Sequence, residues 1–387
     1  MKIAILTQPL GSNYGGILQA YALQCILAEL GHETIVLNRL KGYPALLELM
    51  YRIGSFLKCL FRRFVQHDRR YVLSNPFKKG DYSVFASVDC DNGRLTEFVR
   101  DNIHISDPLY NTVSLRRCVR KLRPDCIIVG SDQVWRQAYS PCITNFFLDF
   151  LDGKEFQCIG RYSYAASFGK AQRVMSAENM KKCSALLKYF DGVSVREQSA
   201  ADYLRDAMGY DSAEVVLDPA MLLPAEEYNK LINENDMCAV GIASYILDCT
   251  SDKDYIVSDI SGILHKPCTR LPVNRTDDKK NPPCLESVSK WLASIAYSDF
   301  VVTDSFHGCV FSIIFKKQFL AIANPERGID RFDTLLGKFG LKDRLVFTRT
   351  DYEKRRKTFF QPINYDGIES VYQALRNESL EFLKNIH

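Results

Sequence analysis

The chain has 387 residues, of which 47% are hydrophobic and 25% are charged, and its formal net charge is +4. This is the composition of a globular protein, and it excludes a disordered or fibrous chain. So small a net charge on so long a chain does not indicate a nucleic-acid partner. The length predicts two domains, each large enough to bury its own core.

Cysteine usage and the N-terminal segment predict a cytoplasmic protein. The 13 cysteines are odd in number and scattered singly, without a CxxC pair or a Cys/His cluster at metal-ligand spacing. We therefore expect reduced thiols and no bound metal. The start, "MKIAILTQPLGSNYGG", has a short apolar run before a turn, so we expect neither a signal peptide nor a membrane span.

Strand-like and helix-like patterns alternate through the first half of the chain. The β-branched run at 2–8 is followed by "GSNYGG", by a stretch of helical periodicity that stops at Gly31, and by a second run at 34–38. The same pattern returns at 124–135, 162–169, 190–209 and 213–223. This order is typical of a doubly wound parallel sheet, and we expect five parallel strands before residue 220.

The second half repeats the pattern and predicts a second α/β sheet. Strand-like runs and helix-like segments alternate at 237–247, 284–298, 298–308, 307–316 and 317–326. Asp218-Pro219 interrupts the pattern, so we place one domain at 1–216 and the other at 217–387. The last segment, 367–387, predicts an amphipathic helix that packs back on the first domain.

Ligands of parallel sheets bind beyond the carboxyl ends of the strands, so two such domains facing each other predict a cleft lined by these loops. In the first loop, Asn13 precedes Gly15 and Gly16, which either let backbone N–H groups approach an anion or serve a turn. The pattern is not GxGxxG and does not indicate a dinucleotide. Ser131 and Asp132 follow an apolar strand, where Asp132 is either a base for a substrate hydroxyl or a helix N-cap.

Arginine and histidine occupy equivalent positions after other strands. Arg196 suits a carboxylate or phosphate because its planar fork donates two parallel hydrogen bonds; the alternative is a surface ion pair with Glu197 or Asp202. Arg327 and Arg331 are the corresponding candidates in the second half, where they follow the strand-like run at 317–326.

His307, followed by Gly308, stands between a strand and a helix, and Asp304 and Ser305 are near enough in sequence to orient its ring. It is a candidate general acid, or a structural histidine. The chain contains no Walker lysine loop, GxSxG or HExxH motif, so group transfer from an anionic donor is favoured over hydrolysis or redox chemistry.

In seven segments the chain resembles the polysaccharide pyruvyl transferase family. They begin with "NYGGILQAYALQCILAELGHET", "PDCIIVGSDQVWR" and "YSYAASFGK", and continue with "VSVREQSA", "VVLDPAMLL", "SDFVVTDSFHGCVFSIIFKKQFLAI" and "RGIDRFDTLL". The resemblance does not cover roughly 41–120 and part of 233–280.

The resemblance implies a GT-B-like fold with two Rossmann-like domains and transfer of the enolpyruvyl group of phosphoenolpyruvate onto two hydroxyls of a sugar. The product would be a cyclic pyruvate ketal on a bacterial surface polysaccharide, such as a capsule or exopolysaccharide, and no cofactor is implied. It assigns His307 as general acid, Asp132 as base, and Arg196, Arg327 and Arg331 as donor-binding cations. The remaining substrate-binding positions would be Asn13, Tyr14, Gly15, Ser131, Ser305 and Gly308.

One position departs from the family pattern. Some relatives have an arginine two residues before the histidine, where this chain has Ser305. Either Arg327 or Arg331 meets the donor's charge, or the donor differs. The alternatives are a nucleotide-sugar glycosyltransferase on the same scaffold and an inactive binding or scaffold member of the family.

A basic amphipathic segment lies in the uncovered insert at about 41–75. In 46–70, apolar residues recur at helical spacing among six arginines and lysines, Arg52, Lys58, Arg62, Arg63, Arg69 and Arg70. Such a helix either lies on an anionic membrane surface, which would suit a lipid-linked acceptor at the inner face of the membrane, or packs its apolar face on the protein.

Overall fold

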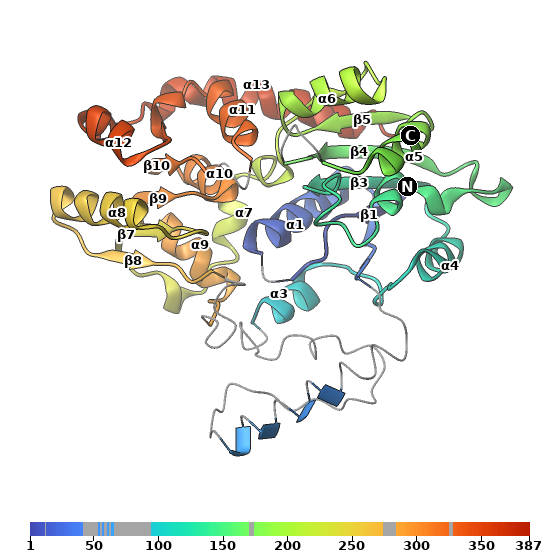
Figure 1. Cartoon of the computed structure of the whole chain (residues 1–387), viewed down its shortest axis with the longest axis horizontal. Coiled ribbons are helices and arrows are strands. Elements are labelled where there is room, and N and C mark those ends of the chain that lie inside the picture. The colour runs from blue at the N-terminus through green and yellow to red at the C-terminus, as the bar shows by residue number, and fades with distance from the viewer. Residues whose placement is uncertain are drawn as a thin grey trace.

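A computed structural model describes residues 1–11, 13–41, 53–54, 56–57, 60–61, 63–65, 94–169, 174–273, 284–324 and 328–387. These residues form two α/β halves, each built on a parallel sheet (Figure 1). The predicted fold class is confirmed. Arg327 and most of the 46–70 segment lie outside the described residues.

The first sheet contains six parallel strands in the order β2-β1-β3-β4-β5-β6, one more than predicted. They are β1 (Lys2–Leu6), β2 (Glu33–Val36), β3 (Cys126–Asp132), β4 (Gly160–Ala166), β5 (Gly192–Val195) and β6 (Glu214–Val215). The central strands are buried, which explains their continuous apolar sequence.

Helices connect the strands of the first half, and capping residues mark one end of some of these helices. They are α1 (Tyr14–Glu29), α3 (Arg94–Asn102), α4 (Thr112–Leu122), α5 (Ala177–Leu187) and α6 (Gln198–Met208). The Asn111 side chain accepts from Ser114 N in a capping box that opens α4. Gly209 ends α6 with φ of 68°, a left-handed conformation that glycine adopts at no steric cost.

The second sheet is also parallel, in the order β11-β10-β9-β7-β8. Its strands are β7 (Val240–Tyr245), β8 (Cys268–Arg270), β9 (Ser298–Thr303), β10 (Gln318–Ile322) and β11 (Leu345–Val346). Its helices are α7 (Ala225–Asn229), α8 (Ser251–Leu264), α9 (Val288–Ala296), α10 (Phe306–Ile314), α11 (Asp330–Lys338), α12 (Arg349–Arg355) and α13 (Tyr365–Lys384). Short 3₁₀ helices are η2 (Ile143–Phe147), η3 (Asp149–Leu151), η4 (Lys154–Phe156), η5 (Pro219–Met221), η6 (Glu234–Asp236), η8 (Lys342–Arg344) and η9 (Arg356–Phe360).

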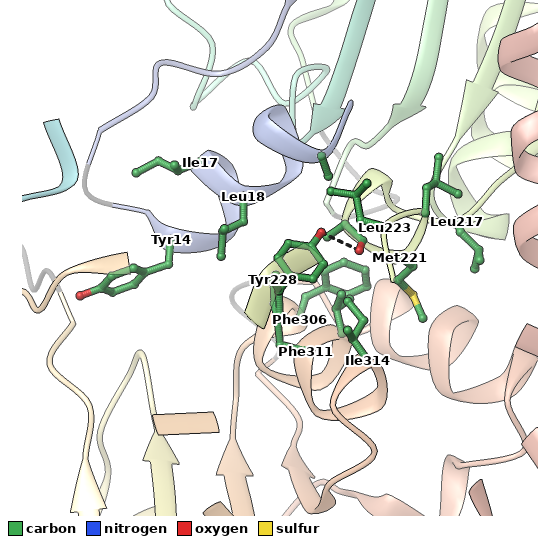
Figure 2. Close-up of a cluster of buried hydrophobic side chains, with 14 of the residues drawn as sticks. Tyr14, Ile17, Leu18, Leu217, Met221, Leu223, Tyr228, Phe306, Phe311 and Ile314 are labelled. Carbon is green, nitrogen blue, oxygen red and sulfur yellow. Dashed lines mark hydrogen bonds between the residues drawn. The ribbon is translucent and has the colours of Figure 1, made fainter. Parts of the chain in front are cut away.

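One apolar core is shared by the two halves (Figure 2). Tyr14, at the start of α1, stacks on Trp291 of α9 with ring centroids 5.2 Å apart. Tyr228 of α7 packs edge-on against Phe311 of α10 at 4.9 Å. Because side chains of both halves fill one core, the position of the first half on the second is fixed by packing.

The C-terminal helix α13 follows the second sheet and packs against the connection between the halves and the first sheet (Figure 1). Ser379 Oγ accepts from Leu217 N at 2.9 Å, and Tyr372 Oη donates to Met221 O at 2.8 Å. The Phe382 ring lies 6.0 Å from the ring of Tyr164 on β4.

Several apolar side chains of the 46–70 segment are exposed where they are described. Leu57 is 58%, Phe61 51% and Phe64 60% accessible, so these three do not pack on the protein. Within the described parts of the chain, no helix is long and apolar enough to cross a membrane.

Candidate functional site

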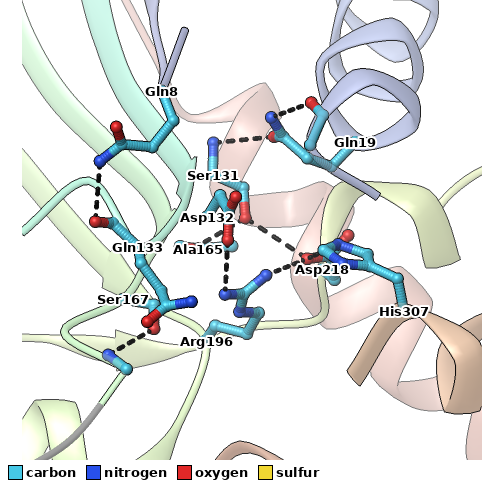
Figure 3. Close-up of polar contacts among 12 residues, drawn as sticks. Gln8, Gln19, Ser131, Asp132, Gln133, Ala165, Ser167, Arg196, Asp218 and His307 are labelled. Carbon is cyan, nitrogen blue, oxygen red and sulfur yellow. Dashed lines mark hydrogen bonds and ion pairs between the residues drawn. The ribbon is translucent and has the colours of Figure 1, made fainter. Parts of the chain in front are cut away.

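Chemistry-bearing side chains gather where the carboxyl ends of the two sheets meet. In a parallel sheet every strand leaves at the same edge, so residues that follow different strands become neighbours. Ser131 and Asp132 end β3, Arg196 follows β5, and His307 is the second residue of α10, directly after β9. Figure 3 shows these side chains converging on one point.

A buried arginine with two carboxylates forms the centre of the site. Arg196 Nη1 donates to Asp218 Oδ2 at 2.7 Å, and Nη2 donates to Asp132 Oδ1 at 3.3 Å. The side chains of Arg196 and Asp218 are 2% and 0% exposed. The surface ion pair considered for Arg196 is therefore wrong: the fork that was expected to bind a ligand is occupied by the protein's own carboxylates.

Asp132 does not cap a helix. It adopts φ of 72°, and the chain continues through turns until η2 begins at Ile143. The N-cap alternative is wrong, and the carboxylate instead faces Arg196. Burial would raise the pKa of Asp132, but the positive charges of Arg196, His307 and Arg331 outweigh burial and lower it.

Asp218 is a site residue, although its place before Pro219 predicted only a break between domains. Its Oδ1 accepts from Ala220 N at 3.0 Å in the turn of η5, while Oδ2 faces Arg196 and accepts from Ser131 Oγ at 3.4 Å. Burial opposes ionisation, yet His307 and Arg196 lower the pKa of Asp218 well below its usual range. Its position at the end of a strand-like apolar run is the signal that singled out Asp132 and Arg196, and it could have identified Asp218 too.

His307 enters this cluster from the second half. Its Nε2 lies 3.6 Å from Asp218 Oδ2, beyond hydrogen-bond distance, and among the described residues it has no hydrogen-bond partner. The opposite edge of the ring packs against Gly15, where an added Cβ would lie 2.0 Å from Nδ1. Gly15 is thus required because the ring needs the space that any side chain would fill.

Asp304 does not orient His307, contrary to expectation. Its carboxylate accepts from Leu247 N at 2.6 Å and from Lys253 Nζ at 2.7 Å, in a separate buried network of the second half. Ser305 caps α10 by accepting from Gly308 N at 3.4 Å. An added Cβ on Gly308 would lie 2.2 Å from Thr303 Oγ1, so this glycine lets α10 pack on β9.

Arg331 approaches the cluster from α11. Its guanidinium lies 5.4 Å from the centroid of the Phe306 ring, and that of Arg196 lies 4.5 Å from the same ring. Burial and the charge of Arg196 lower the pKa of Arg331 to about 10, so it stays cationic at neutral pH. The site therefore holds two arginines near one aromatic ring.

Glu197 forms the other flank of Arg196. Its Oε1 accepts from Ser167 Oγ at 2.7 Å, and its Oε2 lies 4.0 Å from Arg196 Nε. Burial raises the pKa of Glu197 despite the nearby Arg196. Along the described chain, neither Glu197 Oε2 nor Arg196 Nε has a hydrogen-bond partner, so both atoms remain for a ligand or a water.

Two residues predicted to bind the acceptor, Asn13 and Tyr14, differ in exposure. Asn13 is exposed in front of α1, and its side chain makes no capping hydrogen bond. Tyr14 is 1% exposed, stacks on Trp291 and donates from its hydroxyl to Glu286 O at 2.8 Å. This ring joins the two halves and does not line an open surface.

The arrangement is suited to proton transfer and to binding an anion. It combines a buried imidazole, ionised carboxylates and two arginines, which are the groups that general acid–base chemistry on an anionic substrate requires. Among the described residues, no group of three or more His, Cys, Asp or Glu side chains could hold a metal ion.

Two parallel α/β domains whose sheets meet at a polar site define a protein of the GT-B fold. A UDP-N-acetylglucosamine 2-epimerase from Rickettsia bellii is similar, with a TM-score of 0.52 at 11% identity over 99% of this chain and 96% of that one. The Methanocaldococcus jannaschii UDP-GlcNAc 2-epimerase in complex with UDP-GlcNAc and UDP has a TM-score of 0.50 at 12% identity, over 98% and 99% of the two chains. At these identities the likeness concerns the fold alone.

The chain belongs to the polysaccharide pyruvyl transferase family, whose model matches residues 13–326. The resemblance in the sequence is thereby confirmed, and membership implies a transferase. Comparison with curated proteins gives no significant match.

Proposed function

We propose that the protein transfers the enolpyruvyl group of phosphoenolpyruvate onto two hydroxyls of a sugar, forming a cyclic pyruvate ketal in surface polysaccharide biosynthesis. The observation that supports this most directly is that His307 of the second half lies 3.6 Å from the ionised Asp218 of the connection between the halves. An imidazole held beside a carboxylate can deliver a proton to a carbon. Family membership supports the same reaction class.

The reaction needs one proton donor and one proton acceptor. His307 protonates the methylene carbon of the donor, which makes C2 electrophilic, and Asp132 accepts the proton of the first hydroxyl as its oxygen bonds to C2. The second hydroxyl then bonds to C2 as the bond between C2 and the phosphate oxygen breaks. Phosphate leaves with the second hydroxyl proton, and the proton on Asp132 returns to His307, so the site regains its starting state.

The negative charge of the donor calls for cations near the acid and the base. Both terminal nitrogens of Arg196 bind carboxylates of the protein, so we assign Arg196 to holding Asp132 and Asp218 in place. Arg331, whose guanidinium lies 5.4 Å from the centroid of the Phe306 ring, and Arg327, near it in sequence, are assigned to the donor's carboxylate and phosphate. This assignment also suits a chain that has Ser305 where relatives have arginine.

Donor binding and turnover test the proposal together. Calorimetric titration compares phosphoenolpyruvate with UDP-GlcNAc, and turnover is followed as phosphate release with sugars that carry adjacent hydroxyl pairs. We expect saturable phosphoenolpyruvate binding and a product heavier than the acceptor by pyruvic acid less water. His307→Gln should lower kcat by about 10²- to 10⁴-fold and leave donor binding within a few-fold, because a general acid acts mainly in the transition state.

The exposed His104 provides the control, since His104→Gln should turn over like the wild type. Binding of a nucleotide-sugar without phosphoenolpyruvate would replace the proposal with a glycosyltransferase. Absence of any donor binding, together with co-purification of another polysaccharide enzyme, would indicate a scaffold member of the family.

We also propose that the 46–70 segment contacts an anionic membrane that carries a lipid-linked acceptor. The exposed Leu57, Phe61 and Phe64 support this, because exposed apolar side chains in a sequence rich in arginine and lysine are typical of segments that bind the membrane interface.

A further inference from the structure

Asp218 occupies a position from which one carboxylate reaches both halves of the molecule. It lies after the last strand of the first sheet and before η5, and its Oδ1 is held by Ala220 N at 3.0 Å. The remaining oxygen, Oδ2, is left to face Arg196 at 2.7 Å and His307 Nε2 at 3.6 Å. A fully buried carboxylate fixed in this way cannot turn toward water.

The His307 ring is confined on its other side as well. Gly15 of α1 closes on Nδ1, and the Phe306 ring packs edge-on with its centroid 5.3 Å away. The charged groups of the cluster around His307 are Asp132, Arg196, Asp218 and Arg331. Among the described charged groups of this cluster, only Asp218 pairs with the ring, at 3.6 Å from Nε2.

We propose that Asp218 is the positioning residue of this site: its carboxylate orients the His307 ring across the interface and holds the proton on Nε2. A movement of well under 1 Å would turn the 3.6 Å approach into a charge-assisted hydrogen bond. Asp218 would thus fix both the orientation of the ring and the tautomer that carries a proton on Nε2. Its effect on turnover rests on the proposed function, whereas its effect on the ring does not.

The ring is tested without any substrate. Protein labelled with ¹⁵N-histidine is studied by NMR at a fixed pH, and the His307 signals, among those of 6 histidines, are assigned by their loss in His307→Gln. In Asp218→Asn the amide oxygen still caps η5, while an NH₂ group that donates replaces the oxygen that faces His307 Nε2. We expect the wild-type ring to carry a proton on Nε2 and the ring of the variant to lose it there and carry it on Nδ1, because Nε2 then faces a donor.

Asp304→Asn is the matched control, because Asp304 is also buried and lies three residues before His307, yet its carboxylate binds Lys253 and Leu247 N. In this control the proton of His307 should stay on Nε2. A proton that stays on Nε2 in Asp218→Asn, or that leaves Nε2 in Asp304→Asn, would overturn the assignment.

Folding of each variant is checked by circular dichroism. If Asp218→Asn does not fold, the wild type decides: an Nε2–H signal of His307 protected from exchange supports the pairing, and its absence at neutral pH contradicts it.

Turnover then separates this inference from the proposed function. With phosphoenolpyruvate as donor, Asp218→Asn should lower kcat by about tenfold or more while the KM for the donor stays within a few-fold, and Asp218→Glu should recover part of the loss. Loss of the Nε2 proton of His307 in Asp218→Asn, in a protein that never turns over phosphoenolpyruvate, would leave the role of Asp218 standing and remove the proposed reaction.

Discussion

Single residues show how closely the two halves must approach. Gly15 and His307 belong to opposite halves, and the absence of one side chain lets the ring lie against the backbone of α1. The same ring faces the Asp218 carboxylate. Adding one methyl group at Gly15 therefore tests the packing of the two halves and the geometry of the site together.

Gly15→Ala should destabilise the protein by about 1–3 kcal/mol and lower turnover, because its Cβ would lie 2.0 Å from Nδ1 of a buried ring that cannot move away. Urea unfolding and the donor assay measure both effects. Gly11→Ala, in the same loop but with no described atom within 4 Å of its Cβ, should match the wild type. Unchanged stability and turnover in Gly15→Ala would show that the contact is not made in solution.

Elements that connect the halves set the stability of the fold. Helix α13 belongs in sequence to the second half but hydrogen-bonds Leu217 and Met221 of the connection and packs on Tyr164 of the first sheet. The first half therefore depends on the last helix of the chain.

Phe382→Ala should lower the free energy of unfolding by about 3 kcal/mol, because it leaves a cavity between α13 and β4. The exposed Val371 on the same helix, 40% accessible, is the control, and Val371→Ala should change stability by no more than about 0.5 kcal/mol. Chemical denaturation measures both. Equal effects of the two substitutions would contradict packing of α13 on the first sheet.

The exposed apolar residues of the 46–70 segment make a separate prediction. Wild type should float with anionic vesicles at low salt, and Phe61→Ser/Phe64→Ser should lose at least about tenfold of this binding, since two exposed rings would no longer enter the interface. Val113→Ser removes an equally exposed apolar residue, 68% accessible, from α4 and should float normally. If the wild type does not bind anionic vesicles, the membrane proposal is wrong.

At the scale of the whole molecule, buried charges make stability depend on pH. The pKa values of Asp132 and Asp218 lie below their usual range in the folded state. Their stabilisation is therefore complete above the pKa of unfolded aspartates, about 4, and is lost as pH falls through the lower folded values. Arg196 is a large contributor to both shifts.

Arg196→Met should destabilise the protein by about 3–5 kcal/mol at pH 7, because it leaves two buried carboxylates without their cation. The difference from wild type should shrink as pH falls toward 4, since the variant's carboxyls protonate more readily. Urea unfolding at both pH values measures it, with the exposed ion-pair residue Arg120, as Arg120→Met, for comparison. If the two proteins differ equally in free energy of unfolding at both pH values, the ionised aspartates do not cause the loss of stability.

Sequence alone determined the α/β class, the two sheets and the strand-end positions of Asp132, Arg196 and His307, because hydrophobic periodicity and loop placement are local properties of the chain. The same rule applied to Asp218 would have found it. The short edge strands β8 and β11 were not predicted, since two or three residues carry too little pattern.

Only the tertiary structure decided which of these residues meet. Asp304 contacts Lys253, and His307 lies beside Asp218, which is distant in sequence. Tyr14 is buried against Trp291, and the guanidinium of Arg196 binds carboxylates of the protein. These contacts join residues far apart in sequence, and they depend on how two separately patterned sheets pack around one core, which no local pattern encodes.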